Sequence, residues 1–156
     1  MVFAWAAAAW RTDADPAAVA VSARLVQTRL AESGLRVARA ELWWSGASRA
    51  LVALGSAAAD STTPGTAARL AAAVRDASAQ LTEAEVAAGR RAVARDILFA
   101  ARTPDGLARY LGEMLERTGE PRAGQDFLQA LDAVGAPTVR ALLDGLGDGL
   151  TAEMNP

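Results

Sequence analysis

The pattern of apolar and polar positions predicts a strand, a helix, a β-hairpin and then a series of helices. The apolar run over residues 2–10 stops at a polar segment, which favours a buried strand. Asp15 followed by Pro16 is typical of a helix N-terminus, and apolar residues at helical spacing continue to a stop at Gly34.

Residues 37–44 and 49–57 alternate in character on either side of a tight break at Ser45-Gly46, which predicts a hairpin. Since alternate residues of a strand point to opposite faces, we expect one face to pack on helices and the other to be mixed. The residues expected to face the helices are Leu42, Trp44, Val52 and Leu54. Those expected on the other face of the first strand are Arg39, Glu41 and Trp43.

The remainder of the chain predicts helices. They begin near residue 66, at a capping box of Thr82 and Glu85, at Thr103-Pro104, before Phe127 and near Pro137. The fold class is therefore α+β, a small and mostly antiparallel sheet with several helices packed on one face. We expect one domain over residues 1–146 and a flexible tail over 147–156. At least one edge of a three-stranded sheet stays unpaired, so the chain looks incomplete by itself.

The composition excludes several kinds of chemistry. All 16 basic residues are arginine, and the chain has no histidine and no cysteine, which rules out a histidine-ligated zinc site and a thiolate nucleophile. A net charge of −2 gives no basic surface for nucleic acid. The apolar run near the N-terminus is too short to span a bilayer and lacks a preceding positive charge. We therefore expect a cytoplasmic protein with no cofactor.

The order of these segments resembles the pitrilysin/insulinase-type zinc metallopeptidases, which include the mitochondrial processing peptidase. The segment "DADPAAVAVSARLVQTRLAESGL" is similar to the family's turn and helix leading into Gly-Leu. The segments "LTEAEVAAGRRAVARDILFAARTPDGLARYLGEML" and "LDAVGAPTVRALLDGL" are similar to its later helices. The resemblance implies a LuxS/processing-peptidase-like half-domain, from the C-terminal half that does not hold zinc.

The departures from the family pattern bear on function. The family's His-x-x-Glu-His zinc motif is absent, along with every other histidine. The resemblance implies an arginine and a tyrosine that contact substrate around Gly34-Leu35, and here those positions hold Leu30 and Val37. Neither apolar side chain can donate a hydrogen bond to a peptide oxyanion. We therefore expect no catalytic or metal-binding residue in this chain.

Five residues are candidates for contact with a peptide or a partner. Arg29 and Arg36 flank the two replaced positions, where one could substitute for the missing arginine or both could be solvated. Arg39, Glu41 and Trp43 lie on the mixed hairpin face, where they could contact a peptide or a partner, or be covered by helices of the same chain. We expect Phe3 and Trp5 in the core.

Two functional hypotheses follow. The first is a non-catalytic subunit or domain of an insulinase-type zinc peptidase system, forming a heterodimer that completes the peptide chamber of a zinc-bearing partner in the maturation of a small peptide. The second is a stand-alone binding or structural module that keeps the fold and homodimerises. Neither involves nucleic acid or a membrane.

Overall fold

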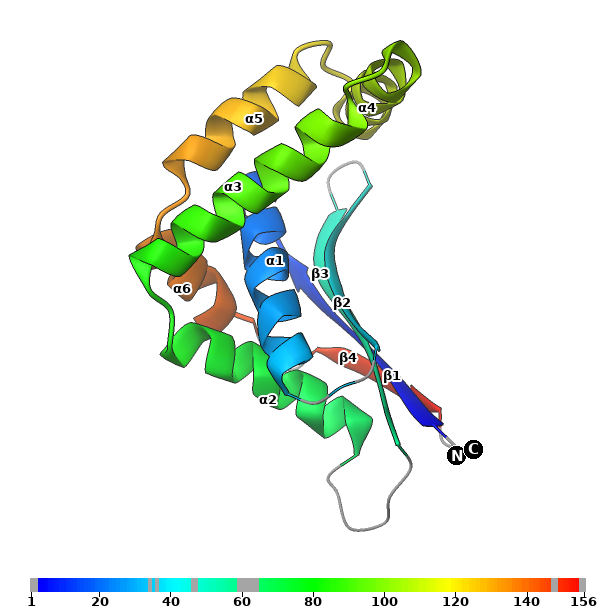
Figure 1. Cartoon of the computed structure of the whole chain (residues 1–156), viewed down its shortest axis with the longest axis vertical. Coiled ribbons are helices and arrows are strands. Elements are labelled where there is room, and N and C mark those ends of the chain that lie inside the picture. The colour runs from blue at the N-terminus through cyan, green and yellow to red at the C-terminus, as the bar shows by residue number, and fades with distance from the viewer. Residues whose placement is uncertain are drawn as a thin grey trace.

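The computed structural model describes residues 3–33, 35, 37–45, 48–58, 65–146 and 149–154. It contains a four-stranded antiparallel sheet of order β2-β3-β1-β4, built from β1 (Phe3–Thr12), β2 (Val37–Ser45), β3 (Ser48–Ala58) and β4 (Leu150–Met154). Among the described residues, helices cover one face of this sheet and leave the other bare (Figure 1). The predicted α+β architecture is therefore confirmed.

The helix α1 (Pro16–Glu32) forms the centre of the molecule because its small and β-branched residues let neighbours approach from several sides. Asp15 accepts a hydrogen bond from the Ala17 amide at 2.8 Å, and Pro16 occupies the first turn, as predicted. Val19, Val26 and Leu30 are fully buried between the sheet and the outer helices. The predicted stop at Gly34 lies outside the described residues.

The remaining helices are α2 (Thr66–Ala79), α3 (Glu83–Ala100), α4 (Pro104–Thr118), α5 (Ala123–Ala133) and α6 (Ala136–Asp144). The predicted capping box is present, since Thr82 accepts from the Glu85 amide and the Glu85 side chain accepts from the Thr82 amide. The α4 helix ends at Gly119, whose φ of 76° is left-handed.

The α3, α4 and α5 helices extend past the hairpin end of the sheet, as Figure 1 shows. Only Val86 and Gly89 of α3 are buried, and both lie in its first half. The apolar residues of α4 are largely uncovered, because Met114 is buried while Leu107 and Leu111 are exposed. We call α3, α4 and α5 the helical arm, and the outer part of this arm has little contact with the core.

The hairpin forms where predicted, but the face assigned to its second strand was wrong. Residues 46 and 47 separate the paired residues Ser45 and Ser48. This two-residue connection places even-numbered positions of β2 opposite odd-numbered positions of β3. Opposite residues of an antiparallel pair share a face. The core side of β3 therefore holds Leu51 and Ala53, both fully buried, whereas Val52 and Leu54 point to the bare face.

Two further expectations were wrong. Trp5 is 43% exposed, because its position in β1 points it to the bare face while Trp10 points into the core; the side chain of Phe3 lies outside the described set. Residues 150–154, assigned to a flexible tail, form β4 and pair with β1 from Trp5 to Ala9. The domain therefore includes this strand.

Candidate functional site

The bare face of the sheet is the first part of the candidate site, and we call it the open face. The register places its side chains in rows that run across β2, β3, β1 and β4. Its described members are Arg39, Glu41, Trp43, Ala50, Val52, Leu54, Ser56, Trp5, Ala7, Ala9, Arg11, Leu150 and Ala152. Four of them are large apolar residues exposed to solvent: Trp43 at 52%, Trp5 at 43%, Leu54 at 37% and Leu150 at 83%.

Small side chains occupy the middle of the open face. Ala7 and Ala9 of β1 lie opposite Leu54 and Val52 of β3, and β4 adds Ala152 in the same row as Ala7. Trp5 of β1 and Trp43 of β2 lie at opposite ends of this row of small side chains. An apolar surface this continuous on one side of a sheet is typical of an interface rather than of a solvated surface.

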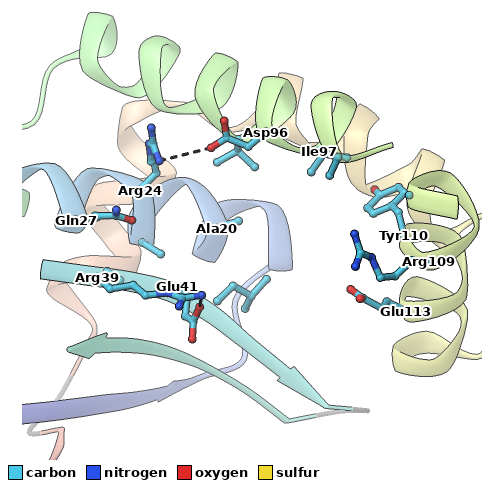
Figure 2. A pocket seen from close by; sticks show the side chains of 16 residues that line it. Ala20, Arg24, Gln27, Arg39, Glu41, Asp96, Ile97, Arg109, Tyr110 and Glu113 are labelled. Carbon is cyan, nitrogen blue, oxygen red and sulfur yellow. Dashed lines mark ion pairs between the residues drawn. The ribbon is translucent and has the colours of Figure 1, made fainter. Parts of the chain in front are cut away.

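The second part of the site is the edge groove, a cavity of about 400 Å³ bounded by α1, β2, α3 and α4. Figure 2 shows Arg24 and Gln27 of α1 above Arg39 and Glu41 of β2, with Arg109, Tyr110 and Glu113 of α4 at one end. The groove lies along β2, which is an edge strand of the sheet. Its polar lining comes from four separate elements.

Most of the charges in the edge groove are already paired. Arg24 lies 3.5 Å from Asp96 of α3, and Arg39 lies 2.6 Å from Glu41, two residues along β2. Tyr110 donates a hydrogen bond to the carbonyl of Gly124 at 2.8 Å, and burial raises the pKa of its hydroxyl. Tyr110 is therefore a neutral donor that joins α4 to α5, and it is not poised to transfer protons near neutral pH.

The structure brings Arg39, Glu41 and Trp43 together on one strand and places Arg29 elsewhere. Trp43 belongs to the open face, while Arg39 and Glu41 lie at the strand edge and also line the edge groove. Arg29 pairs with Glu32 of α1 at 3.1 Å and with Glu85 of α3 at 2.5 Å. Arg36 lies outside the described residues. Helices of the same chain do not cover Trp43.

Sequence reasoning missed the groove residues on the helices. Arg109 and Glu113 are four residues apart on α4, and Arg24 and Gln27 are three apart on α1, so each pair shares a helix face. The same spacing is typical of ordinary solvated helix surfaces. Only the tertiary structure, which places α4 across the groove from the β2 edge, distinguishes them.

The groove lining does not fit a zinc ion. The α1 surface that borders the groove presents Ala20, Ala23, Arg24 and Gln27, which provide two methyl groups, a guanidinium and an amide. Zinc sites in proteins use thiolate, imidazole and carboxylate ligands. Within the part of the chain that the structure describes, no group of three or more such side chains lies close enough to hold a metal ion.

Comparison with known proteins identifies the fold. No family model matches the sequence. No curated protein matches it significantly. Solved structures do match: the chain resembles a protease from Helicobacter pylori with a TM-score of 0.81 and 12% identity, covering 100% of this chain and 42% of that one.

Two further structures extend the comparison. The inactive peptidase domain of a candidate zinc protease from Bordetella parapertussis gives a TM-score of 0.75 at 12% identity, covering 100% of this chain and 92% of that one. The periplasmic protease PqqL from Escherichia coli gives a TM-score of 0.69 at 15% identity, covering 100% of this chain and 19% of that one. The fold is therefore that of pitrilysin-like zinc-protease domains, and the resemblance inferred from sequence is confirmed at the level of fold.

The length of the chain differs from that of most of these structures. It spans about a fifth of PqqL and less than half of the Helicobacter pylori protease. It matches nearly the whole length of the Bordetella parapertussis domain. Among the described residues, every helix is too short or too polar to cross a membrane.

Proposed function

We propose that this chain is a non-catalytic domain of an insulinase-type zinc peptidase system and completes the peptide chamber of a zinc-bearing partner. The observation that carries the proposal is the open face. A sheet with helices on one side and Trp5, Trp43, Leu54 and Leu150 exposed on the other is half of a layered structure. The partner supplies the zinc and the acid–base groups that this sequence lacks.

The non-catalytic assignment rests on the side chains available. The full sequence has no histidine or cysteine. Leu30, where the family resemblance implies an arginine, is fully buried beneath the sheet and reaches no substrate. The likeness to an inactive peptidase domain agrees with a chain that keeps the fold and not the chemistry.

The edge groove would give this domain a part in holding peptide. The outer edge of β2 has no strand partner among the described residues. An extended peptide can pair with such an edge through backbone hydrogen bonds. Arg109 on the opposite wall would then select acidic residues of the peptide, while Glu113 is already paired with Arg117 at 3.7 Å. The maturation of a small peptide in the assembled complex fits this arrangement.

Metal and activity measurements test the proposal. The purified chain should contain no stoichiometric zinc and cleave no peptide. A co-encoded chain bearing His-x-x-Glu-His should hold zinc and become an active, chelator-sensitive peptidase when this chain is added. One tightly bound zinc in this chain alone, or full activity of the zinc-bearing chain without it, would contradict the proposal.

A further inference from the structure

A second cavity lies at the other side of the molecule from the edge groove, in the corner where β1 and β4 meet α2 and α6. Its volume is about 580 Å³, within the range of small-molecule sites. We call it the corner cavity. Its lining includes Trp10, Val74, Arg75, Leu143, Gly149 and Thr151, all in the described part of the chain.

The floor of the corner cavity is apolar. Trp10 of β1, Val74 of α2 and Leu143 of α6 are each at least nine-tenths buried and belong to the main core. Gly149 lies against Trp10, where an added Cβ would come within 2.4 Å of Nε1 and 2.7 Å of both carbons bonded to it. These nearly equal distances place residue 149 over the face of the indole ring. The in-plane N–H therefore points past Gly149.

Among the described residues that line the corner cavity, the polar side chains are an indole N–H, a guanidinium and a hydroxyl. Arg75 of α2 makes no ion pair or hydrogen bond with any residue that the structure describes, and no carboxylate is among the described residues that line the cavity. The Trp10 Nε1–H also has no acceptor among the described residues, although the side chain is only 6% exposed. Unpaired donors on so buried a side chain are uncommon.

The Trp10 donor remains accessible from the cavity. In the described structure, Nε of Arg49 is the only side-chain polar atom that is both inaccessible to solvent and without a hydrogen-bond partner. Nε1 of Trp10 also lacks a partner but is not in that class, so it is accessible to solvent. Thr151 adds a hydroxyl from the core side of β4, because its neighbour Leu150 points to the open face. An indole N–H, a guanidinium and a hydroxyl thus border one apolar space.

We infer that the corner cavity binds a carboxylate attached to an apolar chain. An ionised carboxylate only accepts hydrogen bonds, so it matches a set of donors with one positive charge. Its hydrocarbon portion would cover the floor made by Val74 and Leu143. A phosphate or sulfate would fit less well, because it carries more negative charge than one arginine neutralises. It would also leave the apolar residues of the cavity in contact with water. Two sources share this chemistry: a medium-chain fatty acid and the C-terminus of an apolar peptide.

Titration of the full chain with decanoate tests the inference. Binding should be saturable at one molecule per chain and should shift the Trp10 indole N–H resonance, assigned by its loss in Trp10→Phe. Decanol, which has the same chain length and no charge, should bind at least about tenfold more weakly, since a charge-assisted hydrogen bond contributes that much. A trileucine peptide with a free C-terminus, compared with its amide, tests the peptide source in the same assay.

Variants localise the site. Arg75→Gln should weaken decanoate binding about tenfold. The matched control is Arg91→Gln, which removes another exposed arginine, from α3 and away from the cavity, and should change nothing. Equal binding of decanoate and decanol, no binding of either carboxylate, or shifts confined to the indoles of Trp5 and Trp43 on the open face would each overturn the inference. The outcome does not depend on the proposed role in a peptidase complex.

Discussion

Leu42 and Leu51 lie directly opposite one another across the β2–β3 ladder, and both point toward α1 and the helical layer. This single pair fixes which face of the hairpin is covered. Alternate residues of each strand share the face of this pair, and the residues between them point to the other face. Trp43, Val52 and Leu54 therefore lie on the open face. A shift of one residue would bury Leu54 and expose Leu51.

Truncation of the hairpin residues should therefore show a large asymmetry. Leu51→Ala should lower the free energy of unfolding by about 2–5 kcal/mol, because Leu51 is fully buried and would leave a cavity. Leu54→Ala, the matched control three residues along the same strand, should cost less than about 1 kcal/mol in the isolated chain. Urea unfolding followed by circular dichroism measures both, and the reverse ranking would mean that the register is wrong.

Two glycines of α4 should respond in opposite directions to the same substitution. In Gly106→Ala the new Cβ would lie 1.9 Å from the Ala100 carbonyl oxygen, so the turn between α3 and α4 must shift and stability should fall. In Gly112→Ala nothing lies within 4 Å, so higher helix propensity should stabilise the protein by up to about 1 kcal/mol. Thermal melts of the two variants compare them directly, and a destabilised Gly112→Ala would indicate that α4 is covered in solution.

The capping box should make stability depend on pH in the acid range. A hydrogen bond from the Thr82 hydroxyl, with smaller contributions from the Thr82 amide and Arg29, lowers the pKa of Glu85 below its usual value. A lowered pKa in the folded state stabilises the protein above the unfolded pKa, and this stabilisation is lost as the pH falls through the folded value.

Glu85→Gln isolates that charge. The variant should be less stable than the wild type at pH 7, and this difference in stability should narrow as the pH falls through the lowered pKa of Glu85, below which both side chains are neutral. Glu116→Gln, at an exposed position of α4, serves as the control. A gap between Glu85→Gln and wild type that is constant from pH 7 to pH 3 would argue against the capping interaction.

Local signals in the sequence predicted the helices well. Asp15-Pro16, Thr82 with Glu85 and Thr103-Pro104 each start a helix where expected, because N-caps depend on residues within one turn. The order of elements and the one-sided packing were likewise predictable from periodicity. These features need no knowledge of distant contacts.

The features that sequence did not predict depend on pairing between distant segments. β4 is five residues long and is stabilised by β1, more than 140 residues earlier in the chain, so its local pattern says little. Trp5 and Trp10 are an odd number of positions apart on the same strand, so they must point to opposite faces. Both are equally apolar, so only the tertiary structure shows which one is buried. The edge groove depends in the same way on where α4 lies relative to β2.

The most direct test of the central claim is the mass of the assembly formed with the co-encoded zinc-bearing chain, measured by size-exclusion chromatography with light scattering. The wild type should form a complex, and Trp43→Ala should weaken it by about 2 kcal/mol, or some thirtyfold, while leaving the isolated fold intact. Phe99→Ala, which truncates another exposed aromatic residue, on α3, should not weaken it. A strictly monomeric wild type that ignores the zinc-bearing chain would contradict the account, and a homodimer lost in Trp43→Ala would favour the stand-alone module instead.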